Sequence, residues 1–274
     1  MGYKKRIDSA FINAPTLLIH PTSRYVLFSD CHRGIGNTND NFLKNKHLFK
    51  AALSYYYNSD FTYIELGDGD ELWENQDFNQ ILEIHKDIFD FFKLFSNQKR
   101  FYMLYGNHDM IKKSNSLALE FPIYEGIILE DFHSRKLLYL THGHQTNIFN
   151  STFWSFSHFL VRFIWKPLEQ FGIIAPTSPA KNYSVTKQSE NRLEKWAKQY
   201  KTTIITGHTH RPVLDPFNTQ YCNTGSCVHP HSITCIEIQN SSLLLVKWSL
   251  ENKQDLSIYV KRTILSGPIS IKDL

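Results

Sequence analysis

Five motifs in the sequence combine histidine, aspartate and asparagine, residue types that bind catalytic metal ions. They are Asp30-Cys31-His32, Gly67-Asp68, Gly106-Asn107-His108-Asp109, His142-Gly143-His144 and Gly207-His208-Thr209-His210. Mixed imidazole and oxygen ligands suit Mn, Fe or Zn better than Ca or Mg. Seven residues are candidate ligands: Asp30, His32, Asp68, Asn107, His142, His208 and His210. Seven ligands are too many for one tetrahedral ion, and they suit two ions that share a bridging carboxylate.

The spacing within two of the motifs predicts side chains that point in a common direction. Asp30 and His32 are two residues apart, as are His208 and His210. Alternate residues of an extended chain point to the same side, so each pair is expected to face one ion. Two metals about 3.5–4 Å apart can hold the attacking and leaving oxygens of a phosphoryl displacement. The residue types therefore predict hydrolysis of a phosphoester.

The elements that position these motifs can be read from the apolar pattern. Short runs rich in branched and aromatic residues predict buried strands at 24–29, 61–66, 100–105, 136–141 and 202–206. Apolar residues at helical spacing predict helices at 42–57, 80–95 and 186–200. After residue 219, antiparallel strands joined by turns are expected in "QYCNTGSC", "SITCIEI" and "SLLLVKWSL". The alternation predicts an α/β fold, with every motif at the carboxyl end of a strand, where such sheets bind ligands.

Composition limits the class of protein. The 274 residues are 42% hydrophobic and 14% aromatic, enough to fill a sizeable core in one domain spanning 1–274. The formal net charge of +4 comes without a long basic run, so nothing indicates a nucleic-acid partner. No secretory signal is apparent, and the four cysteines are expected to be reduced thiols in a cytoplasmic protein.

Residues 148–180 form an aromatic-rich stretch interrupted by His158, Arg162 and Lys166. A membrane span needs about 20 mostly apolar residues without such charges, so we expect no transmembrane segment here. The stretch predicts a helical apolar insertion. It either packs on the core or forms a lid over the motifs, and a lid would leave peripheral contact with a membrane open.

The ordered set D-x-H, G-D, G-N-H-D, H-G-H and G-H-T-H resembles the calcineurin-like metallophosphoesterases over roughly residues 24–250. The resemblance implies a two-sheet β-sandwich flanked by helices, and two divalent metal ions that activate water. One ion would be held by Asp30, His32, Asp68 and His210. The other would be held by Asp68, Asn107, His142 and His208, with Asp68 bridging. His108 would assist the leaving group and, with Asn107, contact the phosphate, while Asp109 would orient the ring of His108.

Four further residues lie next to the motifs. Arg33 is a candidate phosphate contact, with a salt bridge as an equal alternative. His144 is expected to lie outside the ligand set, because the resemblance uses the first histidine of its motif. Asp70 and Glu71 are expected to support the site or begin a helix rather than to bind metal.

The bond that is hydrolysed belongs to a phosphomonoester, a phosphodiester or a pyrophosphate, in a small molecule or an amphipathic, lipid-like substrate. Some features resemble the UDP-2,3-diacylglucosamine pyrophosphatases, namely the apolar insertion after the fourth motif and "YCNTGSCV" after the fifth. "HGHQTN" and "GDGDELWE" depart from the pattern of those enzymes. A protein phosphatase, and an inactive metal-binding or scaffold protein with the same fold, are the alternatives.

Overall fold

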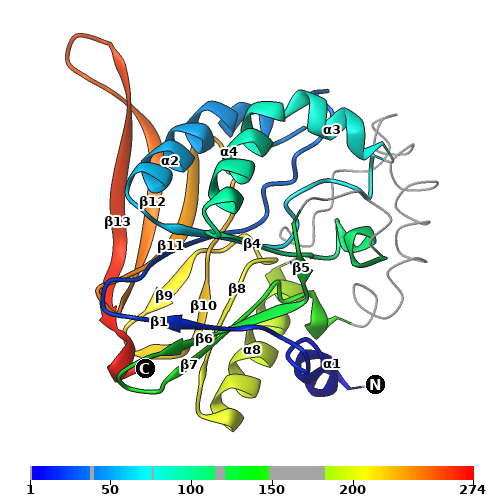
Figure 1. Ribbon diagram of the computed structural model, residues 1–274, viewed down its shortest axis with the longest axis vertical. Coiled ribbons are helices and arrows are strands. Elements are labelled where there is room, and N and C mark those ends of the chain that lie inside the picture. The colour runs from blue at the N-terminus through cyan, green and yellow to red at the C-terminus, as the bar shows by residue number, and fades with distance from the viewer. Residues whose placement is uncertain (1, 38–39, 76, 115–120, 148–182) are drawn as a thin grey trace.

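Two β-sheets form the centre of the computed structural model, which describes residues 2–37, 40–75, 77–114, 121–147 and 183–274 (Figure 1). In spatial order, the seven-stranded sheet consists of β13 (Ile258–Ser270), β12 (Ser242–Asn252), β11 (Ser232–Gln239), β2 (Arg24–Phe28), β3 (Thr62–Leu66), β4 (Phe101–Leu104) and β5 (Ile123–Tyr124). The six-stranded sheet consists of β1 (Thr16–Ile19), β6 (Gly126–Asp131), β7 (Leu137–Thr141), β8 (Thr203–Thr206), β10 (Asn218–Asn223) and β9 (Val213–Asp215).

Helices cover the outer sides of both sheets (Figure 1). The seven-stranded sheet carries α2 (Lys46–Asn58) and α4 (Lys86–Asn97), with α3 (Phe78–Ile84) beside α4. The six-stranded sheet carries α8 (Tyr183–Tyr200), and α1 (Tyr3–Ser9) contacts the short 3₁₀ turn that follows β7. The described 3₁₀ turns are η1 (Leu43–Asn45), η2 (Met110–Ser114), η3 (His144–Thr146) and η6 (Ile271–Asp273).

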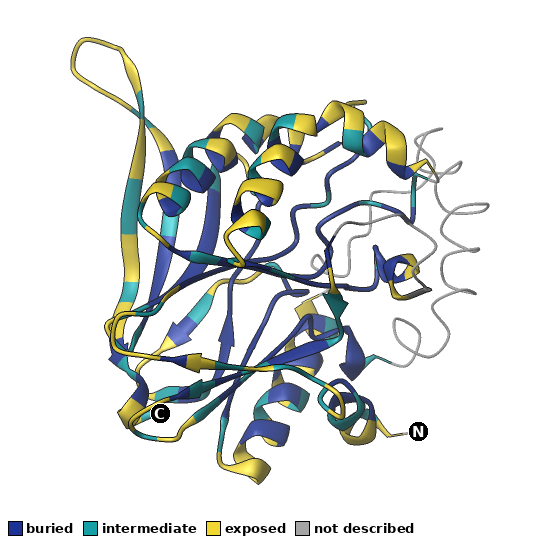
Figure 2. Cartoon of the chain, in the orientation of Figure 1, coloured by how far each residue is buried: buried dark blue, intermediate teal, exposed yellow. Residues whose placement is uncertain are grey.

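Successive side chains of a strand point to opposite faces of the sheet, and in the central strands both sets are apolar. In β2, Val26 and Phe28 point toward the helices, whereas Leu27 points toward the other sheet. Leu27 shares the layer between the sheets with Leu140 of β7 and Ile205 of β8, and all three are fully buried. The central strands, such as β2, β3 and β8, are therefore the most buried part of the chain (Figure 2).

The α/β class, the two sheets and the flanking helices confirm the fold predicted from the sequence. All five predicted strands are present, as β2, β3, β4, β7 and β8. The predicted helix at 80–95 is instead two helices, because the chain leaves helical geometry at His85 (ψ 23°). The Nε2 of that residue lies 3.1 Å from the Gly34 carbonyl, and this long-range contact offsets the local break.

The carboxyl-terminal strands differ from the simple antiparallel arrangement that the sequence indicates. β10 pairs in parallel with β8 and so joins the six-stranded sheet, whereas β11, β12 and β13 are antiparallel neighbours in the other sheet. Asn240 and Ser241 form the two-residue turn between β11 and β12, both with positive φ (51° and 49°). This turn geometry matches the twist of a hairpin.

The apolar stretch at 148–180 lies outside the described residues. The predictions that it is a helical insertion or a lid therefore stay predictions, as does the single domain at 1–274. No described helix combines the length and apolar character that crossing a membrane requires.

Candidate metal centre

The two sheets bring the predicted ligands together from five strand ends. Asp30 and His32 follow β2, Asp68 follows β3, and Asn107 follows β4. From the other sheet, His142 follows β7, and His208 and His210 follow β8. β2, β3 and β4 are parallel neighbours, as are β7 and β8, so the carboxyl ends of each set meet at one edge. The centre therefore spans the boundary between the sheets.

The backbone around the candidate ligands is not extended, contrary to the geometry assumed from the sequence. Asp30, His32, Asp68, His208 and His210 all have positive φ, between 48° and 67°. Non-glycine residues in this region cost about 1–3 kcal/mol each and persist only where the surrounding structure holds them. The histidines and aspartates converge because each chain turns sharply just past its strand, not because alternate residues of a strand share a side.

Asp30, His32 and His210 form one group whose ligand atoms lie within 4.8 Å of one another. Nε2 of His210 is 3.1 Å from Oδ1 of Asp30, and the Nε2 atoms of His32 and His210 face each other at 3.3 Å. Burial opposes the charge on Asp30, but His210 and His142 outweigh it and lower the pKa of Asp30 to about 2. The group is a carboxylate with two imidazoles, a donor set suited to Mn, Fe or Zn.

Asp68, His142 and His208 form a second group. Oδ2 of Asp68 lies 3.1 Å from Nε2 of His142 and 4.0 Å from Nε2 of His32, so it is the carboxylate oxygen between the two groups. Oδ1 of Asp68 accepts the backbone amide of His108 at 2.8 Å. This placement leaves Oδ2 available to both groups, as a bridging ligand requires.

Asn107 supplies the observation that tests whether a cation fits. Its side chain is fully buried, and neither Oδ1 nor Nδ2 has a hydrogen-bond partner among the described residues. A buried carboxamide without partners costs about 1–3 kcal/mol, so such a group signals a missing ligand. The residues present therefore fit a pair of divalent cations, with Asn107 beside the second group.

Two glycines make room for the carboxylates. A Cβ built at Gly106 would collide with Oδ1 of Asp68, and one built at Gly207 would collide with Oδ2 of Asp30. These contacts give a physical reason for glycine immediately before Asn107 and before His208: the loops approach too closely for any side chain.

Hydrogen bonds on the far side of the rings orient two of the histidines. Nδ1 of His142 lies 2.8 Å from the Leu66 carbonyl, an arrangement in which Nδ1 carries the proton and Nε2 faces Asp68. Nδ1 of His32 lies 2.9 Å from Oε2 of Glu71. Burial disfavours charge on His142, but Asp68 outweighs burial and raises its pKa to about 9. The carboxylates thus favour positive charge at this centre.

His108 sits beside the first group and is positioned from two directions. Its Nδ1 lies 2.8 Å from Oε1 of Glu71, and its ring stacks on Trp73 with centroids 4.3 Å apart. Burial lowers the pKa of His108, but the carboxylates of Glu71 and Asp68 outweigh burial and raise it to about 10. His32, Glu71 and His108 also form a third group with metal-ligand spacing.

The prediction that Asp109 orients the His108 ring is wrong, because Glu71 occupies that position. The Asp109 carboxylate instead accepts the backbone amides of Gly106 (2.6 Å) and Gly69 (3.1 Å), and it pairs with Lys112 at 2.6 Å. Asp109 therefore joins the loops after β3 and β4. The spacing of Glu71, three residues after Asp68, is the sequence signal for its role, although the sequence alone does not show which histidines it contacts.

Of the two roles predicted for Arg33, a phosphate contact and a salt bridge, the structure shows the salt bridge. The Arg33 guanidinium is fully buried and binds Glu65 through Nη1 (2.7 Å) and Asp70 through Nε (2.6 Å). Lys112 contacts Asp70 from the other side at 2.6 Å. Burial disfavours charge on Arg33, but Asp70 and Glu65 raise its pKa further above the ordinary value. This buried ion network supports the loop that carries Asp68.

His144 lies just behind the second group. Its ring is buried 5.6 Å from that of His142, and burial together with the charge on His142 lowers its pKa well below the ordinary value. Among the described residues its Nδ1 has no hydrogen-bond partner. His144 is absent from the three groups with ligand spacing found in the described chain.

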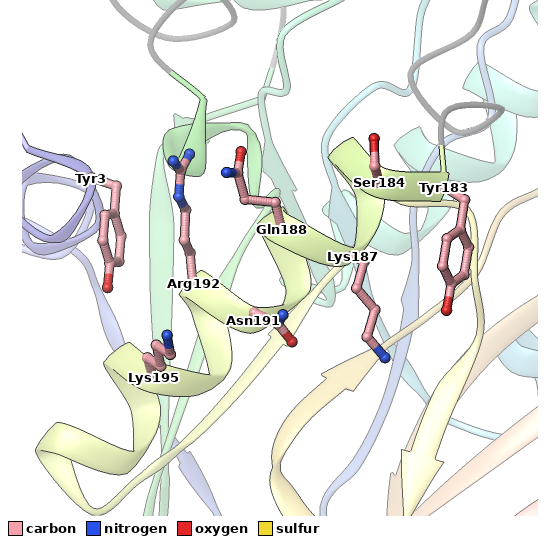
Figure 3. A pocket seen from close by; sticks show the side chains of 8 residues that line it. All are labelled: Tyr3, Tyr183, Ser184, Lys187, Gln188, Asn191, Arg192 and Lys195. Carbon is pink, nitrogen blue, oxygen red and sulfur yellow. The ribbon is translucent and has the colours of Figure 1, made fainter.

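A separate groove of about 510 Å³ lies along α8 and next to Tyr3 (Figure 3). Lys187, Arg192 and Lys195 give it a basic lining, and Arg192 donates to the Thr146 carbonyl at 2.8 Å. None of the candidate ligands lines this groove, so it is distinct from the metal centre.

Comparison with known proteins agrees with this geometry. Residues 23–212 match the calcineurin-like phosphoesterases, a span that carries every candidate ligand. The chain belongs to this family. No curated protein sequence matches it significantly.

Solved structures resemble the chain at low sequence identity. Vps29 of Chaetomium thermophilum is 13% identical, covering 90% of this chain and 97% of its own, with a TM-score of 0.45. A point mutant of a cold-active protein tyrosine phosphatase is 14% identical, covering 92% of this chain and 84% of its own, with a TM-score of 0.44.

Proposed function

We propose that this calcineurin-like phosphoesterase is a dinuclear enzyme that hydrolyses a phosphomonoester, phosphodiester or pyrophosphate bond. The observation that carries the proposal is the position of Asp68, whose Oδ2 lies between two groups of ligand atoms. The partnerless carboxamide of Asn107 supports it. Seven residues would hold the ions: Asp30, His32 and His210 on one side, Asn107, His142 and His208 on the other, and Asp68 between them.

When bound, two divalent ions supply positive charge and lower the pKa of a coordinated water. The remaining steps belong to the chain. His108 directs Nδ1 at Glu71, which leaves Nε2 free to face the substrate. The Glu71 carboxylate beside Nδ1 raises the pKa of His108 and so favours a protonated ring, which can donate to the leaving oxygen. Trp73 fixes the plane of the ring by stacking on it.

An inactive scaffold with the same fold is the alternative from another class. The complete set of candidate ligands together with the oriented His108 favours the enzyme. For the substrate, the apolar composition of residues 148–180 favours an amphipathic, lipid-linked phosphoester over a phosphoprotein. The partner is then a small or lipid-like phosphorylated molecule.

The direct test measures hydrolysis of a phosphomonoester, a phosphodiester and a pyrophosphate before and after chelation, with metal content determined in parallel. We expect chelation to abolish activity, and Mn, Fe or Zn to restore it. Asp68→Ala should remove both ions and all activity, because losing the shared carboxylate loosens both groups. An Asp68→Ala protein that remains active without bound metal would overturn the dinuclear proposal. A metal-loaded native protein inactive on all three substrates would favour the scaffold.

A further inference from the structure

β13 is the outer strand of the seven-stranded sheet, and in the described part of the chain no strand pairs with its free edge. With β12 it forms a hairpin that extends beyond the body of the molecule (Figure 1). An exposed strand edge presents unpaired backbone N–H and C=O groups, which only another strand can satisfy in register. The hairpin stands clear of the helices, so a second strand can approach it.

The outer half of this hairpin is largely exposed (Figure 2), and several of its exposed residues are aliphatic. Ile258 is 67% exposed, Ile264 is 46% exposed and Leu256, at the turn, is 83% exposed. Val260 lies opposite Leu250 of β12, and both are exposed as well. Surface strands normally carry polar groups at such positions, so an apolar strip along an open edge marks an interaction surface.

The two halves of β13 differ in how their edge is protected. Below Ile264 the register with β12 shifts twice, and Pro268 offers no backbone N–H. Bulges and prolines are devices by which proteins block edge pairing. Residues 258–264 contain neither a bulge nor a proline, because Ile258 through Ile264 pair regularly with β12. The two cations in this segment, Lys261 and Arg262, are paired within the sheet with Glu251 and Glu237. The free edge is therefore open only along the outer, apolar half.

We propose that two copies of this chain associate through this half of β13, in antiparallel register about a two-fold axis at Arg262. Directly opposed residues in an antiparallel pair point to the same face. An axis at Arg262 places Val260 of each copy opposite Ile264 of the other, so this aliphatic pair occurs on both sides of the axis. An axis at Lys261 would put Val260 opposite Arg262, and an axis at Thr263 would put Arg262 opposite Ile264. Of these three registers, only the central one keeps both Val260 and Ile264 from lying opposite Arg262.

The two arginines that meet at this axis are already neutralised. Nε of Arg262 donates to Oε1 of Glu237 at 2.8 Å, and the Glu237 side chain is fully buried. Arg262 is therefore held against its own sheet and does not confront its counterpart as a free charge. The same strand supplies both sides of the contact, so the surface is complementary to itself, as a two-fold dimer requires.

The first test measures molar mass by sedimentation of the full chain from about 1 to 200 µM. The native protein should be dimeric at the upper concentrations, and Ile264→Lys should raise the dimer dissociation constant at least about 100-fold, because a charge at an edge blocks pairing. Leu18→Lys is the matched control: Leu18 is 41% exposed on β1, the edge strand of the other sheet. A monomeric native protein, or equal effects of the two substitutions, would overturn the proposal.

The second test fixes the register. Val260→Cys combined with Ile264→Cys should give a covalent dimer on mild oxidation. The two positions are about 13 Å apart within one strand, too far to join internally. The native cysteines are buried and free, so they do not compete. Tyr259→Cys with Ile264→Cys is the control, because these residues point to opposite faces. Equal cross-linking of the two pairs would refute the register centred on Arg262.

Discussion

At the scale of single residues, His108 and Glu71 act as one unit. Glu71 contacts Nδ1 of both His108 and His32 through its two carboxylate oxygens. Burial opposes the charge on Glu71, but His108 outweighs burial and lowers the pKa of Glu71 to about 2. The Glu71 carboxylate therefore stays ionised and holds the His108 ring in one orientation. Its negative charge favours the protonated form of His108.

This coupling predicts non-additive kinetics. His108→Ala should lower kcat by ~10²–10⁴ with metal content unchanged, because a general acid is lost but no ligand is. Glu71→Gln should lower kcat less, since the ring remains but loses its charged partner. The double variant should be no slower than His108→Ala alone. Steady-state kinetics with metal analysis of the three proteins checks this, and loss of an ion in His108→Ala would instead place His108 among the ligands.

The residue types predicted which side chains converge, but they did not predict the backbone conformation that brings those side chains together. The motifs identify Asp30, His32, His208 and His210 because few other groups bind transition metals, and the structure brings them together. Their left-handed backbone was not predictable from spacing, since it depends on loops that meet across two sheets. The contacts of Arg33 and Asp109 could not be predicted for the same reason: a charged residue beside a motif gives no sign of which buried partner it finds.

At the scale of elements, the loops after β3 and β4 rest on buried ions. Arg33, Glu65, Asp70, Lys112 and Asp109 all lie inside the protein, and each carboxylate contacts at least one of the cations. Such a network does not add much net stability over a well-packed apolar core, but breaking it leaves an uncompensated buried charge.

Replacing Arg33 with methionine should therefore lower the free energy of unfolding by about 3–5 kcal/mol, because Glu65 loses its cationic partner inside the protein. Urea denaturation measures the effect. Lys86→Met is the matched control: Lys86 pairs with Asp90 on the surface of α4, and its loss should change stability by less than about 0.5 kcal/mol. An Arg33→Met protein of native stability but reduced activity would restore the phosphate-contact role.

Sequence patterns predicted the central elements better than the peripheral ones. β2, β3, β4, β7 and β8 were predictable because strands buried on both faces are short, apolar and bounded by turns. The break between α3 and α4 was not, because apolar spacing continues through it and the compensating contact comes from Gly34. β13 was also missed: most of its residues are exposed, so it lacks the pattern of a buried strand.

The segment at 148–180 carries a prediction that rests on its composition alone. If it covers the substrate, replacing it with a short Gly/Ser linker should raise KM for a lipid-linked phosphoester, at about 0.8 kcal/mol for each methylene no longer buried. Hydrolysis of a small chromogenic phosphodiester should be nearly unchanged. Parallel kinetics on both substrates provide the measurement, and equal losses on both would show that the segment is part of the core.

At the scale of the whole molecule, the metal centre joins the two sheets. Asp30, His32 and Asp68 come from the seven-stranded sheet, and His142, His208 and His210 come from the six-stranded sheet. Each group with ligand spacing, apart from the one that includes His108, draws on both sheets. Bound ions would therefore hold the sheets together as well as serve the reaction.

Stability should consequently depend on metal. Ions that bind only the folded chain stabilise it by about 4 kcal/mol at a thousandfold excess over the dissociation constant. Chelation should lower Tm, and added Mn should raise it again in a concentration-dependent way. Asp68→Ala is the control and should respond to neither treatment. Identical melting curves for the native protein with and without Mn would argue against a centre that joins the sheets.

The contact between the loops of Asp30 and His208 also sets a time at which the centre can first exist. The amide of His208 donates to Oδ2 of Asp30 across 178 residues of chain. At about 5–20 residues per second, a ribosome releases Asp30 roughly 9–36 s before His208. Until then a nascent chain lacks His210 from the first set of ligands and His208 from the second, so each ion has three of its four candidate ligands. A chain truncated before β8 should therefore retain no metal after desalting. The choice of ion would then fall to the metals that surround the almost finished polypeptide, not to those that meet its first motif.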